Sequence, residues 1–408
     1  MLLRETLLAV LDQPAVPPAP AGELQRHRQP TWNRSQQQSH ALVLTGVRRC
    51  GKSTLQGQIR QAVKGKAVTI NLEDTRLYGL GPEDFAPLLA LLDEHHPDAS
   101  IYLDEVQEVP EWQRLVRALL DKGRRVCLTG SNASLLGREL GSKLTGRHLS
   151  HEVYPFSYRE FLEFTTQQPG AASLQDYLAR GGFAAALSAG ADQGAVLLRE
   201  LLRDVVQRDI VSRHALRASR PLMTLMLHLL AHTGQPLSLQ ALAKGLALPS
   251  VAQTGRMIEY LQDAWLLLAV PRFSTKFKQR VVSPPKYYAI DTGLAAANTP
   301  NPTPDLGRRF ENAVLLHLRR LGDSPTFAAM PNDWECDLVT PSLAIQCCAR
   351  LTPENRAREL RGLLQAAALP GGIKGQPREL LVLTLDQEDE LQEQGVTMRA
   401  IPAWKWLD

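Results

Sequence analysis

The sequence predicts an α/β protein whose first half forms a parallel sheet with helices on its faces. From Ala41 onward, short apolar strands alternate with helical stretches, and the strands are expected at 41–46, 67–74, 100–105 and 125–131. This alternation is typical of a mostly parallel sheet, because parallel strands are joined by crossover helices. At roughly 150 residues per domain, the chain of 408 residues is expected to form two or three domains.

The chain is expected to divide into four parts. Residues 1–40 begin with a short amphipathic helix at 1–13 and continue as a linker rich in Pro, Gln and His. Residues 41–160 hold the parallel sheet. Residues 161–285 hold helices and then a basic stretch, an order that resembles a winged helix. Residues 286–408 return to mixed α/β character.

The composition excludes several classes of protein. Apolar residues make up 44% and charged residues 22%, which argues against wholesale disorder. The sequence has no uninterrupted apolar run of about 18 residues, so no membrane span is expected, and residues 1–13 do not resemble a signal peptide. The five cysteines are odd in number and include no C-x-x-C pair. They argue against a disulfide framework and a zinc site and favour a cytoplasmic protein.

Residues 46–53 match the phosphate-loop pattern G-x-x-x-x-G-K-S/T, after an apolar strand and at the start of a helix. The glycines let backbone N–H groups turn toward phosphates, and the helix N-terminus adds its dipole. Lys52 would reach the β- and γ-phosphates, and the Ser53 hydroxyl would bind Mg²⁺. The alternative is a glycine turn ahead of a helix. The expected nucleotide-binding residues are Gly46, Val47, Arg48, Arg49, Cys50, Gly51, Lys52, Ser53 and Thr54.

Three further elements support a nucleotide site. Asp104 and Glu105 end an apolar strand, where Asp104 would hold Mg²⁺ and Glu105 would act as general base on the attacking water. Ser131 and Asn132 follow the next strand and could sense the γ-phosphate or orient the water, although they also suit a simple turn. Arg147 follows a glycine and could act as an arginine finger across a subunit boundary, or be an ordinary surface arginine.

Several segments together resemble one group of prokaryotic AAA+ ATPases. They are GVRRCGKST, IYLDEVQEVPEW, LTGSNASLL and GRHLSHEVYPFSYREFL. Members of that group carry a C-terminal domain of unknown function, number 4143, and further matches follow in order at 177–183, 208–214, 286–294 and 308–318. The resemblance implies ATP binding and hydrolysis, with ATP and Mg²⁺ as cofactors. It also implies active sites between subunits, and hence a homo-oligomer such as a hexameric ring.

The C-terminal region also resembles the restriction-endonuclease type of nuclease fold. That fold uses a helix Glu, an Asp on a strand, and Glu/Gln-x-Lys on the next strand, and the corresponding residues here are Glu311, Asp337, Gln346 and Cys348. Nucleases of this type need clustered carboxylates for Mg²⁺ and a lysine beside the attacking hydroxide. A neutral thiol at Cys348 cannot supply that charge, so we expect an inactive site and a domain that grips DNA. The alternative is an unrelated α/β domain with ordinary residues at these positions.

Residues 271–286 form a basic stretch without an acid, interrupted by two aromatic residues. The candidate DNA-binding residues are Arg272, Phe273, Lys276, Phe277, Lys278, Arg280 and Lys286. Cations on a protruding wing contact phosphates, and aromatic rings stack on unpaired bases. A solvated β-hairpin of ordinary composition is the alternative.

These observations lead to three hypotheses about function. The first is a DNA-directed ATPase that couples hydrolysis of Mg²⁺·ATP to remodelling of duplex or branched DNA, such as a Holliday junction. The second is a nucleotide-controlled switch that binds a protein partner. The third is a metal-dependent nuclease with an ATPase motor, against which Cys348 argues.

Overall fold

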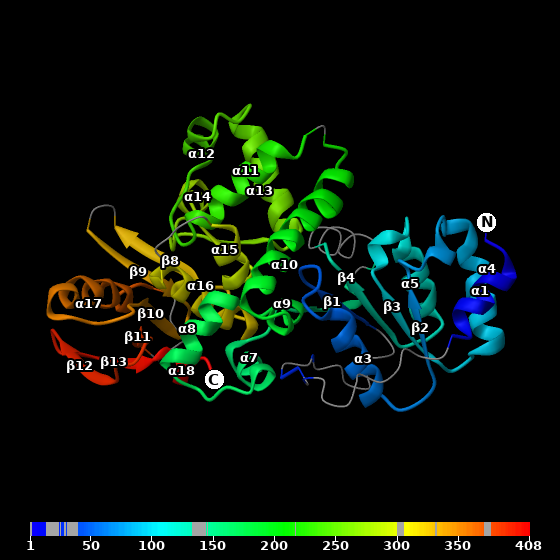
Figure 1. Cartoon of the computed structure of the whole chain (residues 1–408), viewed down its shortest axis with the longest axis horizontal. Helices are drawn as coiled ribbons and strands as arrows, with labels where there is room; N and C mark the ends of the chain where they lie inside the picture. The colour runs from blue at the N-terminus through cyan, green and yellow to red at the C-terminus, as the bar shows by residue number, and fades with distance from the viewer. Residues whose placement is uncertain are drawn as a thin grey trace. The chain divides into compact units, whose positions relative to one another are not determined.

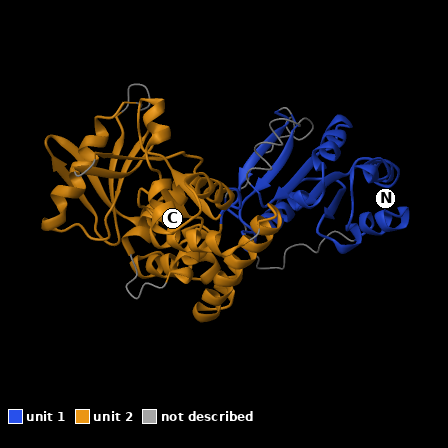
Figure 2. Ribbon diagram, turned by 90° about the horizontal axis from the view of Figure 1, so that it is seen from above, with its two compact units in different colours: residues 1–154, 263–265 blue, residues 155–262, 266–408 orange. Residues whose placement is uncertain are grey.

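The protein is described from a computed structural model of the whole chain. The structure describes residues 2–13, 24, 26–27, 30, 40–132, 144, 146–216, 218–299, 306–330, 333–370 and 377–408, so the predicted linker at 14–40 lies almost wholly outside the described residues. The chain divides into two compact units (Figure 2). Unit 1 comprises residues 1–154 and 263–265, and unit 2 comprises residues 155–262 and 266–408.

A parallel sheet forms the centre of unit 1. Its strands are β1 (Ala41–Thr45), β2 (Ala67–Asn71), β3 (Ser100–Asp104), β4 (Val126–Gly130) and β5 (His148–Glu152). They pair in the order β2-β3-β4-β1-β5, and every pair is parallel. The carboxyl ends of β1, β3 and β4 therefore meet at one edge. The predicted strands are confirmed, whereas β5 has a polar sequence, HLSHE, and was not predicted.

Helices cover both faces of this sheet (Figure 1). They are α1 (Arg4–Leu11), α3 (Lys52–Ala62), α4 (Pro82–His95) and α5 (Trp112–Asp121), with short 3-10 turns η1 (Thr75–Leu77) and η2 (Val106–Glu108). The helix predicted at 1–13 forms because it buries Leu7, Val10 and Leu11 in the same hydrophobic cluster as α4 and α5. Burial of side chains of this kind stabilises the fold by about 1.5–3 kcal/mol each.

The first part of unit 2 is helical. Its helices are α7 (Tyr158–Thr165), α8 (Ala171–Arg180), α9 (Ala184–Ser188), α10 (Ala191–Asp204), the π-helix η4 (Val205–Ser212), α11 (Arg220–Ala231), α12 (Leu239–Gly245) and α13 (Val251–Asp263). Two antiparallel strands follow, β6 (Leu267–Val270) and β7 (Lys286–Ala289), with the short helix α14 (Phe277–Val282) between them. Helices precede the basic stretch, as the sequence predicts, whereas the antiparallel pairing of β6 with β7 was not predicted. The assignment as a winged helix stays a prediction.

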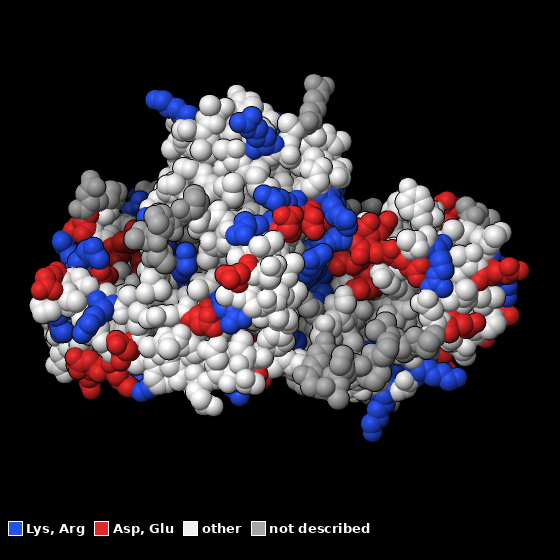
Figure 3. Space-filling view, in the orientation of Figure 1, with Lys and Arg blue, Asp and Glu red and all other residues white. Residues whose placement is uncertain are grey.

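A mixed sheet forms the second part of unit 2. Its strands are β8 (Thr326–Met330), β9 (Trp334–Val339), β10 (Leu343–Cys347), β11 (Glu379–Thr384), β12 (Asp389–Glu393) and β13 (Val396–Pro402), in the order β12-β13-β11-β10-β9-β8. Helices α15 (Thr292–Asn298), α16 (Leu306–Arg320), α17 (Pro353–Ala367) and α18 (Ala403–Trp406) accompany it. Helix α17 packs against β9 closely, because a Cβ atom on Gly362 would lie 1.9 Å from the Glu335 carbonyl oxygen. Acidic side chains gather on the surface near β12 (Figure 3).

One buried carboxylate joins two of the predicted motifs in unit 2. The Asp291 carboxylate accepts hydrogen bonds from the backbone N–H groups of Gly182 (2.7 Å) and Leu294 (2.8 Å). A Cβ atom on Gly181, which has φ +70°, would lie 2.1 Å from Asp291 Oδ1. Burial raises the pKa of Asp291 to about 6. The segments at 177–183 and 286–294 therefore lie side by side. The first segment needs glycines at this contact because the second places the carboxylate of Asp291 there.

Among the described helices, none has the length and apolar character needed to cross a membrane. The five cysteines are all free, and all except the half-buried Cys347 are buried.

Candidate nucleotide site and acidic pocket

The phosphate loop leaves β1 at Thr45 and enters α3 at Lys52. Gly46 has φ +154°, and a Cβ atom there would lie 2.1 Å from the Val153 carbonyl oxygen. Gly51 has φ +98°, in the region that L-residues with side chains avoid. Both glycines of the motif are therefore required by the backbone, as the sequence predicts.

Lys52 is folded back over this loop. Its side chain is buried, and Nζ donates hydrogen bonds to the carbonyl oxygens of Gly46 (3.1 Å) and Val47 (3.2 Å). The same Nζ lies 3.8 Å from Glu105 Oε1. The predicted phosphate-binding cation and the predicted general base are therefore within ion-pair distance of one another.

The two predicted Mg²⁺ ligands lie next to one another. Ser53 Oγ donates a hydrogen bond to Asp104 Oδ1 at 3.0 Å, and the Thr129 hydroxyl donates to the same oxygen. Thr129 also accepts a hydrogen bond from the backbone N–H of Glu105 at 2.9 Å. Burial raises the pKa of Asp104, against the lowering effect of the hydrogen bonds from Thr129 and Ser53. Hydroxyl and carboxylate oxygens are ligands that Mg²⁺ prefers, so the residues present fit this ion.

Residues at the tip of β4 contact the acidic strand through Gln107, which the sequence did not single out. Gln107 Nε2 donates to Glu105 Oε2 at 2.5 Å and to Ser131 Oγ at 3.2 Å. Ser131 and Asn132 are both buried at this edge of the sheet. The predicted pair therefore lies beside the general-base candidate, and Gln107 joins the two strand ends.

Arg147 lies at the other end of the sheet. Its carbonyl oxygen accepts a hydrogen bond from the backbone N–H of Ala41, the first residue of β1, at 3.0 Å. Its guanidinium pairs with Asp121 at the end of α5, at 2.5 Å. Because the phosphate loop follows the last residue of β1, Arg147 is a strand length away from the nucleotide site of its own chain.

Arg26, which the sequence analysis did not single out, supports the phosphate loop by hydrogen bonds to backbone carbonyl groups. Arg26 is buried, and its guanidinium donates to the carbonyl oxygens of Cys50 (3.0 Å) and Tyr154 (2.7 Å). Gln58 of α3 fixes the same segment by accepting from the Arg26 backbone N–H at 3.2 Å. Burial raises the pKa of the Cys50 thiol, which donates to the Val153 carbonyl oxygen. Cys50 is therefore a packing residue of the loop.

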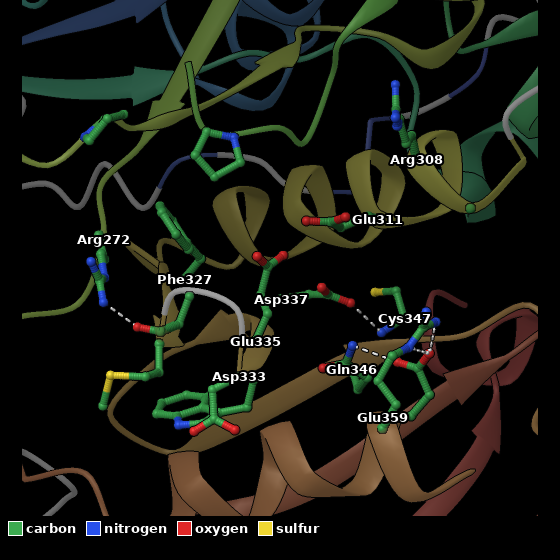
Figure 4. Close-up of a pocket in the computed structure, with 17 residues that line it drawn as sticks. Arg272, Arg308, Glu311, Phe327, Asp333, Glu335, Asp337, Gln346, Cys347 and Glu359 are labelled. Carbon is green, nitrogen blue, oxygen red and sulfur yellow. Dashed lines mark hydrogen bonds and ion pairs between the residues drawn. The ribbon is translucent and has the colours of Figure 1, made fainter. Parts of the chain in front are cut away.

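A pocket of about 670 Å³ opens in unit 2 between α16, α17 and the strands β8, β9 and β10 (Figure 4). Five acids line it: Glu311, Asp333, Glu335, Asp337 and Glu359. Three arginines line it as well: Arg272, Arg308 and Arg358. The predicted residues Glu311, Asp337 and Gln346 are thus brought to one pocket, whereas Glu335 and Glu359 were not predicted.

Lys286 lies under this pocket and not on a DNA-binding surface, which corrects the sequence interpretation. Its side chain is 0% exposed, and Nζ lies 2.8 Å from Glu311 Oε1, 2.7 Å from Glu335 Oε1 and 3.9 Å from Asp337 Oδ1. Burial alone would lower the pKa of Lys286, but these carboxylates outweigh it and raise that pKa. The composition of the stretch 271–286 hid this role, because Lys286 follows several exposed cations in the sequence.

The other predicted nuclease positions differ from the expected arrangement. Gln346 Nε2 donates to Glu359 Oε2 at 2.8 Å. Cys348 packs in the hydrophobic cluster that contains Leu360 and Leu363 of α17, so it does not stand where a lysine would act. Asp337 Oδ2 accepts from the Cys347 backbone N–H at 2.8 Å, and burial followed by the charge of Glu311 raises the pKa of Asp337. The lysine of this cluster is Lys286, which comes from β7 and not from β10.

The remaining basic residues fall into two groups. Arg272 donates to the Ala329 carbonyl oxygen, and Phe273 is half-buried against the core of the C-terminal sheet. The others are exposed in or next to α14: Lys276, Phe277, Lys278 and Arg280. The exposed fraction of Phe277 is 80%, and the apolar residues Val281 and Val282 are 67% and 73% exposed.

Two families of known proteins match parts of the chain. Residues 38–162 match a family described as an AAA domain, and residues 171–305 match a family described as a domain of unknown function, number 8612. The second family differs from the 4143 family that the sequence resembles, so that part of the resemblance is not confirmed.

The chain is also similar to two uncharacterized proteins. One, from Methanocaldococcus jannaschii, is 28% identical over 393 residues, which are 89% of this chain and 87% of that protein. The other, from Haemophilus influenzae, is 27% identical over 301 residues, which are 69% of this chain and 75% of that protein.

Solved structures with partial similarity include two nucleotide-binding proteins. A Walker-type ATPase of Pyrococcus abyssi aligns with a TM-score of 0.43 and 15% identity, over 63% of this chain and 90% of that one. DnaA of Aquifex aeolicus bound to AMPPCP aligns with a TM-score of 0.26 and 14% identity, over 56% of this chain and 84% of that one.

The family match and the geometry of the site agree on the first part of the chain. A phosphate loop, a buried lysine and a strand ending in two carboxylates occur within the residues that match the AAA domain. The first part of the chain is therefore an AAA-type P-loop ATPase domain, and the α/β fold class predicted from the sequence is confirmed.

Proposed function

We propose that this ATPase couples hydrolysis of Mg²⁺·ATP to the remodelling of duplex or branched DNA, including four-way junctions of the Holliday type. The observation that carries the hydrolytic part is the contact network at the carboxyl edge of the sheet in unit 1. There the Ser53 hydroxyl bonds to Asp104, and the Lys52 ammonium lies beside Glu105. Mg²⁺·ATP would supply the phosphoryl group, and these residues would bind and orient it.

Each residue of the network has a distinct role in the proposal. Residues 46–54 cradle the phosphates, and Ser53 and Asp104 hold Mg²⁺. When Lys52 turns toward the phosphates it leaves the carbonyl oxygens of Gly46 and Val47 and releases Glu105. Glu105 then accepts a proton from the attacking water.

The strand tip next to this network completes the proposed site. Ser131 and Asn132 orient the water at the end of β4, where Gln107 already joins Ser131 to Glu105. Arg147 cannot reach this site in its own chain, so its proposed role as an arginine finger requires a second copy. This role is the reason to propose a homo-oligomer, such as a hexameric ring, with active sites between its subunits.

The exposed surface of α14 supports the DNA-binding part of the proposal. Lys276, Lys278 and Arg280 present their charges around the exposed ring of Phe277. Residues 271–286, which include these cations, contain no acidic residue. Such a surface binds phosphates by releasing counterions, and the ring is free to stack on an unpaired base.

Two further parts of the proposal concern the C-terminal half and the location of the protein. We propose that the nuclease-like region, whose relation to the 4143 family stays a hypothesis, lacks cleavage activity and contributes to DNA binding. The free cysteines are the reason to propose a cytoplasmic protein.

The test measures ATP turnover by the full chain without nucleic acid, with single-stranded DNA, with duplex and with a four-way junction. Stimulation by DNA that falls steeply with salt is expected. Glu105→Gln should abolish turnover under all four conditions, whereas Lys278→Ala combined with Arg280→Ala should lower only the stimulation. Absence of binding to any nucleic acid at low salt would refute the DNA-directed function and leave the ATPase in place.

A nucleotide-controlled switch that binds a protein partner is the second candidate. The apolar residues Phe277, Val281 and Val282 favour it, because exposed apolar side chains on one short helix suit a protein interface as well. In this case turnover is slow and insensitive to DNA, and Phe277→Ser lowers partner binding without changing the affinity for DNA.

A further inference from the structure

The backbone of Glu105 turns sharply at the end of β3. Glu105 has φ +54°, in the left-handed region that residues with side chains rarely adopt. Such a conformation persists only where its surroundings hold it, and it is concentrated at functional sites. Here the Glu105 N–H donates to Thr129 Oγ1 at 2.9 Å, and the Glu105 carbonyl oxygen accepts from the Glu108 N–H at 3.2 Å. The turn η2 therefore begins directly after Glu105, and Gln107 of this turn reaches back to the Glu105 carboxylate.

The two oxygens of the Glu105 carboxylate have different neighbours. Oε1 lies 3.8 Å from Lys52 Nζ, and this ammonium group in turn bonds to the carbonyl oxygens of Gly46 and Val47. Oε1 therefore faces the phosphate loop. Oε2 accepts a hydrogen bond from Gln107 Nε2 at 2.5 Å, so it faces the turn η2.

Ser131 determines which end of the Gln107 amide faces Glu105. The Ser131 backbone N–H donates to Gln107 Oε1 at 3.4 Å, and Gln107 Nε2 donates to Ser131 Oγ at 3.2 Å. A backbone N–H can only donate, so the amide oxygen belongs on its side. The reverse orientation would place that oxygen against the Glu105 carboxylate with no hydrogen between them. The Gln107 amide is therefore held with its donor end toward Oε2 of Glu105.

We propose that Gln107 is a positioning residue for hydrolysis, which anchors Oε2 of Glu105 so that Oε1 takes the proton from the attacking water. This inference rests on the proposed role of Glu105 as general base. When Lys52 turns toward the phosphates, Oε1 is released, whereas Oε2 keeps its bond to Gln107. A general base must lie within hydrogen-bond reach of the proton that it accepts, and a carboxylate without this anchor would rotate away from that position. Gln107 acts on the water only through Glu105.

The chemistry of an amide suits this role. An amide donates a hydrogen bond without carrying a charge, so it orients the carboxylate and leaves the negative charge available for the proton. A lysine or arginine at position 107 would hold Glu105 in a charged hydrogen bond after Lys52 has left. A carboxylate at position 107 could not donate and would repel Glu105. These differences define the substitutions that test the proposal.

The test measures kcat for ATP hydrolysis and the Kd for ATP separately, with variants of the full chain at position 107. Gln107→Glu keeps the volume of the side chain but replaces the donor by an acceptor. Gln107→Ala removes the amide and keeps the test valid if Gln107→Glu fails to fold. Both variants should lower kcat by about tenfold to a hundredfold, because a small displacement of a reacting group costs rates of this order. The Kd for ATP should stay within about twofold of the wild-type value, since the amide acts after the nucleotide has bound.

Two comparisons separate positioning from a general defect of the domain. Gln61→Ala removes an exposed glutamine of α3 and should turn over ATP as the wild type does. Gln107→Ala added to Glu105→Gln should slow turnover no further, because the amide acts only through the carboxylate. Wild-type kcat in both variants at position 107 would overturn the proposal, as would a parallel loss of ATP affinity or a full additional loss of turnover in the double variant. Turnover by Glu105→Gln at the wild-type rate would instead refute the general base itself, and this inference with it.

Discussion

Replacement of Lys286 by methionine separates the structural interpretation from the sequence interpretation. A surface cation on a DNA-binding wing can be removed at almost no cost in stability. Lys286, however, is 0% exposed and pairs with Glu311 and Glu335 at 2.8 and 2.7 Å. Methionine keeps most of the volume and removes the charge, so three carboxylates are left without their cation.

The magnitude follows from the burial of those carboxylates. Removal of one partner from a buried ion pair costs about 3–5 kcal/mol, because the remaining charge has no compensation. A free-energy change of 1.36 kcal/mol corresponds to a factor of ten. The equilibrium constant for local opening should therefore rise by roughly two to four powers of ten. Because the charge of Lys286 lowers the pKa of Asp337, its loss raises that pKa in the folded state further. Protonation of Asp337 then relieves the variant, and the deficit shrinks as the pH falls.

Hydrogen exchange read by mass spectrometry is the appropriate assay, because the chain has two units and need not unfold in one step. Peptides from β7 and α16 should lose protection by this amount in Lys286→Met, whereas peptides from the sheet of unit 1 should not change. Lys278→Met, which removes an exposed cation from α14, is the matched control and should stay within about 0.5 kcal/mol of the wild type. Equal protection from hydrogen exchange in Lys286→Met and Lys278→Met at pH 8 would refute the interpretation that Lys286 belongs to a buried charge cluster.

Three further predictions concern other parts of the chain. Arg26→Ala removes the guanidinium that bonds to the Cys50 carbonyl oxygen, so nucleotide affinity measured by calorimetry should fall about tenfold. The turnover of bound ATP should change less. Unchanged affinity would exclude a positioning role for Arg26. Gly46→Ala places a methyl group against the Val153 carbonyl oxygen and should abolish nucleotide binding, whereas Gly57→Ala, with open space around it, should not. Asp291 has its pKa raised to about 6 from 3.8, so its contribution to stability is present below pH 4 and is lost as the pH rises through 6, a change of about 3 kcal/mol. Asp291→Asn should flatten this decline in the free energy of unfolding measured from pH 4 to 7, and an unchanged slope would show that another group titrates.

Much of unit 1 could be predicted because its information is local. The apolar strands, the glycines and the lysine of the phosphate loop stand close together in the sequence, and parallel pairing brings Asp104 to the same edge without further assumptions. Strand β5 could not be predicted, since its alternation of polar residues suits a loop equally well. Arg26 could not be predicted either, because its partners are backbone carbonyl groups up to 128 residues away.

The acidic pocket shows where sequence reasoning fails for a physical reason. A motif assigns the lysine by its spacing on β10, but electrostatics requires only that a cation lie among the carboxylates. Lys286 meets that requirement from β7, and Cys348 is free to pack against α17. Residue type and neighbours in sequence made Lys286 look like a surface residue, and only the fold places it next to Glu311.

Release of phosphate from ATP by the full chain tests the central claim most directly. In the presence of Mg²⁺ the wild type should turn over ATP. Glu105→Gln should bind ATP with similar affinity but release phosphate at least about a hundredfold more slowly, because it lacks the group that accepts the proton from water. Turnover by Glu105→Gln at the rate of the wild type would contradict the account of the nucleotide site.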